Sequence, residues 1–224
     1  MNTRAVLALL AGLPLGACTG SFFKSTLSTP VAYVLSAHTD TGSGQAAAPS
    51  AAPSVAPMTG PPVPVDLSIL RPRMRPGLDT DRIVAKYPDR RLDFYAGAKW
   101  SGSLDDVVQD LTVQLFHLRT NLRSVSSEST RFTSGYWLEI EVEDFQAEYS
   151  APGAAPVIKV HLLARLGRAA DHAGIGNYEA MASQAAVENR LEPIIDAYER
   201  AANTALSQIV DSTAATLAVA AEAH

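Results

Sequence analysis

The sequence predicts an α+β domain in which two helices pack on one face of a mixed or antiparallel β-sheet. Three observations indicate this class: short segments of alternating apolar residues come first, a segment with helical periodicity interrupts them, and one long helical segment ends the pattern. Hydrophobic residues make up 47% of the 224 residues, which is enough apolar material for one core. We therefore expect a single domain over residues 30–212.

The first part of this domain contains segments with strand character. Residues 31–35 are β-branched and aromatic, and residues 63–69 alternate apolar with polar or small side chains. Pro64 has no backbone N–H, so it restricts the second segment to a sheet edge or to the beginning of a strand. Residues 82–85 and 92–95 flank a turn-rich stretch, and we expect them to form a hairpin.

Residues 103–118 carry the clearest helix signal. Ser103 precedes the apolar positions and Asp106 follows three residues later, which is the spacing of a helix start. The apolar positions at helical spacing are Leu104, Val107, Val108, Leu111, Leu115 and Leu118. A strand over residues 122–126 is expected to follow the helix.

Two longer strands, residues 136–149 and 157–166, carry opposite charges on their polar faces. The polar face of the first is acidic and includes Glu139, Glu141 and Glu143. The polar face of the second includes Lys159, His161 and Arg165. We expect the two strands to pair as an antiparallel hairpin across residues 151–156, so that the exposed charges complement each other.

Residues 188–220 form one continuous helical pattern. Pro193 is tolerated only in the first turn of a helix, so the helix should begin near Leu191. The face expected to cover the sheet consists of Ile194, Ile195, Tyr198, Ala201, Ala202, Ala205 and Ile209, with Leu206 as an option. Residues 213–224 are alanine-rich and either extend this helix or fray from it.

Residues 37–62 interrupt the domain. They contain five prolines and seven alanines and almost no large apolar side chain. Such a composition cannot bury enough surface to offset the conformational entropy lost on ordering. We expect a disordered loop inserted between the first two strands.

The N-terminus has the layout of an export signal. Arg4 supplies a positive charge, residues 5–13 form an apolar run, and Pro14 ends this run. The run is too short for a membrane-spanning helix, which needs about 20 residues. Residues 1–17 are therefore predicted to be a signal peptide, and residues 18–29, rich in Ser and Thr, a tether to the domain.

Residues 15–18, Leu-Gly-Ala-Cys, resemble the bacterial lipobox. This resemblance implies cleavage between Ala17 and Cys18, a diacylglyceryl group on the Cys18 sulfur and acylation of the new amine. Cys18 is the only cysteine, so lipidation would consume the single thiol of an exported chain. An ordinary cleaved signal that leaves a free thiol is the alternative. Thr19 replaces the Asp that retains some lipoproteins in the inner membrane, which favours the outer membrane.

The sequence has no motif for catalysis or metal binding. Its five histidines lie far apart, and one cysteine cannot form a CxxC site. The GxSxG, P-loop and GxGxxG patterns do not occur. A net charge of -5 argues against nucleic acid as the main partner. We therefore expect no enzymatic activity, no metal and no cofactor apart from the covalent lipid on Cys18.

Two charged sets are candidates for a partner interface. The basic set consists of Arg71, Arg73 and Arg75 and suits anionic headgroups or the acidic side chains of a partner. The acidic set consists of Glu139, Glu141 and Glu143 and suits a basic partner. Each set also has a plainer interpretation, because charged residues blunt the edges of sheets and occupy their solvated faces.

A series of short motifs connects the chain to a known family. In order along the sequence, they are Tyr33-Val34-Leu35, Leu78-Asp79, Arg82-Ile83-Val84, Tyr95, Trp100 and the helix start from Ser103 to Val108. Together they resemble the motifs of the ABC-type transport auxiliary lipoprotein family, of the PqiC or YmbA type. The resemblance extends from Cys18 to about Leu206, and residues 37–62 and 167–177 depart from the family pattern.

The resemblance implies a non-enzymatic lipoprotein that accompanies an ABC transporter and an MCE-domain (mammalian cell entry) protein. Such a system moves phospholipids or other hydrophobic molecules across the bacterial cell envelope. The lipid on Cys18 would anchor the protein, most simply at the outer membrane facing the periplasm, and a homo-oligomeric ring is left open. Trp100 and Tyr95 are interpreted as fold landmarks. The alternative function is an envelope assembly or secretion lipoprotein that binds an outer-membrane protein.

Overall fold

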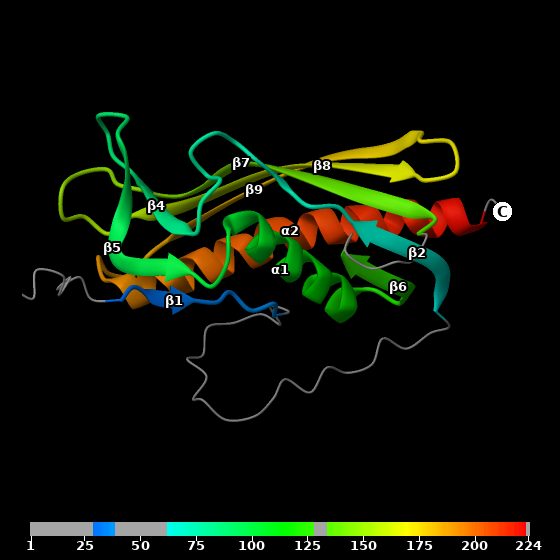
Figure 1. The fold of residues 1–224 in the computed structure, drawn as a ribbon, viewed down its shortest axis with the longest axis horizontal. Helices are drawn as coiled ribbons and strands as arrows, with labels where there is room; N and C mark the ends of the chain where they lie inside the picture. Colours follow the sequence, from blue (N-terminus) through cyan, green and yellow to red (C-terminus); the bar gives the residue numbers. More distant parts are fainter. Residues whose placement is uncertain (1–28, 39–61, 128–133, 223–224) are drawn as a thin grey trace, which may run out of the picture.

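The computed structural model describes residues 29–38, 62–127 and 134–222. Within these residues, a mixed β-sheet curves around two helices that pack on the same face (Figure 1). This arrangement confirms the predicted α+β class. The predicted signal peptide, most of the tether and residues 39–61 of the predicted loop lie outside the described residues.

The longest strand, β7 (Tyr136–Glu148), organises the sheet. On one side it pairs antiparallel with β8 (Val157–Arg168), which pairs antiparallel with β9 (Gly174–Ala185). On its other side three strands follow one another, all parallel to it: β2 (Val63–Ile69), β3 (Arg73–Met74) and β4 (Arg82–Lys86). The predicted hairpin of β7 and β8 is therefore confirmed.

Two branches complete the sheet beyond β2 and β4. Strand β6 (Leu122–Ser127) pairs parallel with β2. Strand β5 (Leu92–Trp100) pairs antiparallel with β4, which confirms the second predicted hairpin, and β1 (Val31–Tyr33) pairs parallel with β5. The start of the described chain thus lies on an edge of the sheet.

Helix α1 (Leu104–Arg119) begins where the sequence predicts. Ser103 is its N-cap residue, and the Ser103 carbonyl accepts the Val107 N–H at 3.1 Å. The Ser103 hydroxyl does not accept a backbone N–H, as an N-cap side chain usually does. It donates instead to Asp106 Oδ2 at 2.6 Å. The spacing of Ser103 and Asp106 thus marks the start of the helix correctly, although Ser103 does not cap it through its side chain.

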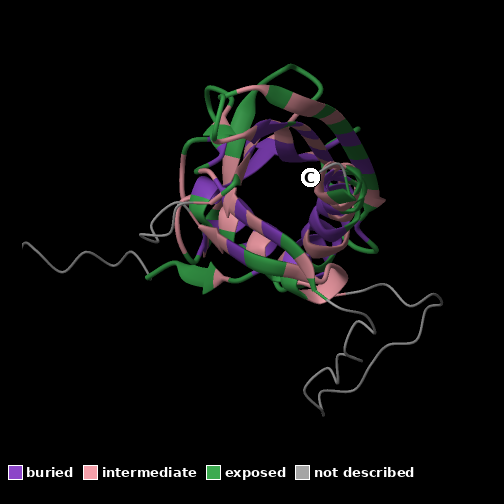
Figure 2. Ribbon diagram, turned by 90° about the vertical axis from the view of Figure 1, so that its right-hand side faces the viewer, coloured by how far each residue is buried: buried purple, intermediate pink, exposed green. Residues whose placement is uncertain are grey.

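Helix α2 (Leu191–Glu222) runs along most of the sheet (Figure 1). Its 32 residues correspond to about 48 Å. It begins at the residue predicted from Pro193, and every position predicted to face the sheet is buried, Leu206 included. The helix continues past residue 212 without a break. Seen end-on, it lies inside the curve of the sheet, and buried residues line the interior (Figure 2).

An aromatic cluster fixes α2 against the centre of the sheet. The Trp100 ring makes edge contacts with Tyr198 and Phe145, at centroid distances of 5.2 and 6.0 Å. The buried Tyr198 hydroxyl donates to the Val84 carbonyl at 2.7 Å, and burial raises its pKa well above the usual value. Trp100 is thus part of the core packing between β4, β5, β7 and α2.

The hydrophobic pattern did not predict β9 or β3. The inward positions of β9 include Ala180 and Ala182, whose small side chains give little contrast with its outward residues. These alanines allow α2 to approach β9 closely, so tertiary packing and pairing with β8 define the strand. Strand β3 has only two residues, Arg73 and Met74, and pairing with β7 alone defines it.

Candidate functional site

The basic set of the sequence analysis lies along β3 and its flanks. Arg73 is opposite Glu141 in the register of β3 and β7, so the set lies beside the acidic residues of β7. We call Arg71, Arg73 and Arg75 the arginine ladder. Their side chains are 60%, 70% and 57% exposed, respectively. The ladder is therefore a surface feature that nevertheless has partners within the chain.

The structure brings the basic and acidic sets together. Arg73 Nε lies 2.8 Å from Glu139 Oε1. Arg75 Nη1 lies 3.9 Å from Glu143 Oε2 and 3.8 Å from Asp144 Oδ1. Two sets that the sequence suggested as separate partner surfaces thus compensate each other across β3 and β7. Among the described residues, Glu141 is the exposed member of the acidic set for which no ion pair is found.

Arg71 links the ladder to the first turn of α1. Its Nε donates to Asp105 Oδ2, and its Nη2 lies 3.2 Å from Asp106 Oδ1. Asp105 is buried, which raises its pKa, but the hydrogen bond and the positive charge of Arg71 outweigh burial and hold the pKa below its usual value. The same contact raises the pKa of Arg71. The helix dipole further favours the two carboxylates at this position.

This arrangement suits docking rather than catalysis. A guanidinium has five N–H donors, and the ion pairs of Arg73 and Arg75 described above use only some of them. The remaining donors can bind carboxylate or phosphate groups of a partner while the carboxylates of β7 and α1 hold the side chains in place. A preorganised cation loses less conformational entropy on binding than a free surface arginine.

The outer face of β8 and β9 carries the complementary charges predicted for it. Arg165 lies opposite Glu139, and His161 lies opposite Asp144. His161 Nε2 is also 2.8 Å from Glu179 Oε1 on β9. Basic and acidic side chains therefore lie beside one another on this face of the sheet.

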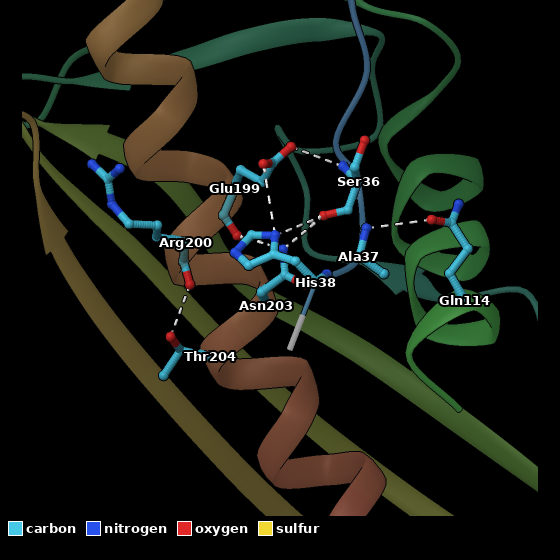
Figure 3. A network of polar contacts seen from close by, with 8 residues as sticks. All are labelled: Ser36, Ala37, His38, Gln114, Glu199, Arg200, Asn203 and Thr204. Carbon is cyan, nitrogen blue, oxygen red and sulfur yellow. Dashed lines mark hydrogen bonds and ion pairs between the residues drawn. The ribbon is translucent and has the colours of Figure 1, made fainter. Parts of the chain in front are cut away.

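A second polar network holds the beginning of the domain against both helices (Figure 3). We call residues 34–38 the strap. Its backbone N–H groups donate to side chains of the helices: Ser36 to Glu199 Oε2 at 2.9 Å, Ala37 to Gln114 Oε1 at 3.3 Å and His38 to Asn203 Oδ1 at 3.0 Å. Leu35 inserts into the core. The strap therefore crosses between α1 and α2 and is pinned from both sides.

Asn203 is the centre of this network. Its Nδ2 donates to the carbonyls of Ser36 and Glu199, both at 2.9 Å, while Oδ1 accepts from His38. The side chain is buried, and its donors and acceptor are matched to the strap backbone. Sequence reasoning missed this residue, although an asparagine inside the apolar stripe between Ala202 and Leu206 was a visible signal of a buried polar contact.

The described part of the chain offers no further reactive cluster. No group of three His, Cys, Asp or Glu side chains that could hold a metal occurs among the described residues. In the same residues, no helix combines the length and apolar character needed to cross a membrane. Cys18 and Ala17, the predicted lipidation and cleavage positions, lie outside the described residues.

Comparison with known families gives a match over most of the chain. A family model described as an ABC-type transport auxiliary lipoprotein component matches residues 48–214. These residues include the arginine ladder, the acidic set, all of α1, most of α2 and Asn203. No curated protein matches the sequence.

Solved structures share the fold. Protein XCC0632 from Xanthomonas campestris superposes with a TM-score of 0.66 at 20% identity, covering 87% of this chain and 97% of that protein. The hypothetical protein CT253 from Chlamydia trachomatis gives a TM-score of 0.51 at 8% identity, covering 70% of this chain and 99% of that one. At such identities the likeness concerns the fold.

Proposed function

Because the chain belongs to the ABC-type transport auxiliary lipoprotein family, we propose that it is the lipid-anchored accessory subunit of an MCE-type ABC transport system. In this role it helps to move phospholipids or other hydrophobic molecules across the bacterial cell envelope. The observation that carries the proposal is the family match over residues 48–214, which covers α1, most of α2 and most of the sheet. The lipobox-like residues 15–18 agree with it.

The proposed anchor is the lipid on Cys18, in the outer membrane and facing the periplasm. Each methylene that enters the bilayer contributes about 0.8 kcal/mol, so two or three acyl chains bind a protein durably. Exchange of Cys18 for serine removes the acceptor sulfur. The Cys18→Ser variant should leave the membrane fraction, whereas the unchanged protein should sediment with outer-membrane markers. A variant that stays in the membranes and retains function would contradict the anchor.

The strap would join this anchor to the domain. The tether from Cys18 enters the described chain at residue 29, just before β1 and the strap. A load on the tether would therefore reach α1 and α2 through the contacts of Glu199, Gln114 and Asn203. Such a fixed connection would keep the domain in place at the membrane while it binds a partner.

The arginine ladder is the proposed partner surface. The exposed guanidinium groups of Arg73 and Arg75 retain donors, and the neighbouring exposed Glu141 adds an acceptor on the same surface. The complete system would contain an MCE-domain protein and ABC transporter subunits. A homo-oligomeric ring of the accessory subunit is part of the proposal, and sedimentation of the detergent-solubilised protein measures it.

Cross-linking of intact envelopes tests the proposal directly. The tagged protein is cross-linked in cells, purified in detergent, and its partners are identified by mass spectrometry. Recovery of an MCE protein with ABC subunits is the expected result. The Arg73→Gln, Arg75→Gln double variant should reduce that recovery, while the Arg190→Gln variant, altered before α2 at a distance from β3, should not. Recovery of outer-membrane assembly or secretion components without any transporter subunit would instead support the alternative function.

A further inference from the structure

A mostly apolar groove lies at the C-terminal end of α2. It is formed between the last turns of this helix, the start of β7 and the adjoining ends of β8 and β9, and its volume is about 700 Å³. Ile175, Ala215, Val219 and Ala220 contribute its apolar wall. Val219 is 69% exposed, so its side chain is accessible to a ligand in the groove. The volume lies within the range of about 300–1,000 Å³ that is typical of small-molecule sites.

Small residues leave space between the last turns of α2 and β9. The last turns of α2 present alanines to the groove, so the helix leaves space beside β9. Tyr178 lies across Gly176, where an added Cβ would come within 2.2 Å of the tyrosine oxygen. The Tyr178 hydroxyl donates to Thr216 Oγ1 at 2.7 Å and thereby ties β9 to α2. This hydrogen bond holds the two walls together at a fixed separation.

Arg168 is the one cationic side chain among the described residues that line the groove. It follows the inward-facing Leu166 at the end of β8 and lines the groove together with Tyr136. Its Nε atom is buried and has no hydrogen-bond partner among the described residues. The nearest carboxylate oxygen, Asp171 Oδ1, is 3.6 Å away, beyond hydrogen-bond distance. A buried donor without a partner is costly, so the site favours an acceptor that enters from outside.

We propose that this groove binds one acyl chain of an anionic lipid, with the chain along α2 and the charged headgroup at Arg168. The apolar wall fits the chain, and the guanidinium fits the carboxylate or phosphate of the headgroup. Among the described residues, seven line the groove, whereas a stable protein interface uses about 20–30 residues on each side. The proposal rests on the proposed transport function and deepens it, because the domain itself would contact a hydrophobic substrate.

The lipid would come from outside the chain. The segment from Cys18 to Pro30 spans at most about 43 Å when fully extended. The groove lies at the C-terminal end of α2, and β1 begins near the opposite end of the molecule (Figure 1). We take the acyl chains of the anchor on Cys18 to remain in the bilayer, away from the groove. The occupant is a separate lipid molecule, and its headgroup chemistry distinguishes a phospholipid from a free fatty acid.

Photocross-linking in cells tests this assignment. Cells that make the full-length protein are fed a photoreactive, alkyne-tagged long-chain fatty acid, which enters their phospholipids, and are then irradiated. The protein is purified and digested, and light-dependent adducts are mapped by mass spectrometry. Adducts are expected within residues 168–175 or 215–220. The adduct mass identifies the headgroup, and the anchor on Cys18 is labelled without light and on a different peptide.

Variants with matched controls make the test specific. Ala215→Trp fills the groove from an exposed position and should remove the adducts, whereas Ala151→Trp, in the turn between β7 and β8, should leave them unchanged. Arg168→Gln should lower their yield about tenfold through loss of a charge-assisted hydrogen bond, and Arg190→Gln should not. Thermal unfolding confirms that each variant is folded.

Three results would overturn the assignment. The first is the absence of adducts from both peptides, and the second is an adduct yield that Ala215→Trp does not change. The third is that Ala215→Trp removes oligomers but not adducts, which would make the groove a contact between copies of the chain. None of these results depends on which proteins are recovered with the chain. The transport role and the lipid groove can therefore fail independently.

Discussion

At the scale of single residues, a buried amide connects the first and last parts of the domain. Asn203 satisfies three backbone groups, two of them in the strap, at distances of 2.9 to 3.0 Å. Replacement by alanine would remove the hydrogen bonds that Asn203 makes to the Ser36 carbonyl and the His38 N–H in a partly buried setting. Such loss costs about 1–3 kcal/mol for each buried group that remains unsatisfied.

Asn203→Ala should therefore lower the free energy of unfolding by about 1–3 kcal/mol. Thr204→Ala is the matched control, because Thr204 is exposed and its hydroxyl bonds only to the Arg200 carbonyl within α2 (Figure 3). Urea unfolding measures the free energies, and hydrogen exchange of residues 34–38 reports on the strap. Equal effects of the two substitutions, with unchanged exchange in the strap, would show that Asn203 does not pin it.

Gly167 allows a close approach that no other residue permits. An added Cβ would lie 2.0 Å from Trp137 Cζ2 and 2.2 Å from Cε2, because the indole lies across the glycine on the neighbouring strand. Gly167→Ala should force the ring aside and destabilise the fold by about 1–3 kcal/mol. Gly174→Ala places its Cβ in open space within the same hairpin and should change stability much less. Similar melting temperatures for both variants would contradict this role of Gly167.

At the scale of elements, Arg71 joins β3 to α1. Its partner Asp105 is buried, whereas Glu139, the partner of Arg73, is less so. Arg71→Gln should therefore reduce the melting temperature more than Arg73→Gln, because a buried carboxylate loses its counterion. Adding Asp105→Asn to Arg71→Gln should recover part of the loss, since the buried charge is then absent. Calorimetry of the three variants checks both orderings, and an equal loss for the two single variants would refute the first.

Most helices and strands could be predicted from the sequence, but their long-range contacts could not. The alternation in β7 and β8 and the helical spacing in α1 and α2 are strong, so these elements and the buried face of α2 were predicted correctly. Strand β9 was missed because its inward alanines weaken the alternation. Both charged sets were named from the sequence, but their mutual pairing depends on the parallel register of β3 and β7, which no local pattern encodes. The strap network joins residues about 165 positions apart and was likewise unpredictable.

At the scale of the whole molecule, carboxylates paired with cations make the free energy of unfolding depend on pH. Hydrogen bonds from Arg123 and Ser124 lower the pKa of Asp66, a hydrogen bond from Lys99 lowers that of Asp81, and one from Lys86 lowers that of Glu148. The folded chain thus binds fewer protons than the unfolded chain at low pH. The stability that these groups contribute is present above their unfolded pKa values, near 4, and is lost as the pH falls through the lowered folded values.

The free energy of unfolding should therefore decline as the pH falls below about 4. Asp66→Asn should decline less steeply, because it lacks one of the groups whose protonation opposes folding. Urea titrations of both proteins at a series of pH values measure the two slopes. Identical slopes would show that Asp66 does not contribute to the acid sensitivity.

In the cell, we propose, this lipoprotein works in the same process as an ABC transporter. The most direct measurement compares outer-membrane permeability to a hydrophobic fluorescent dye in three strains, which lack the lipoprotein, the ATPase recovered with it, or both. Our account predicts the same increase in dye entry in all three, because loss of either component stops one process. If dye entry in the double deletion equals the sum of the increases in the two single deletions, the two components act separately. Normal dye entry without the lipoprotein, together with increased entry without the ATPase, would also contradict the proposal.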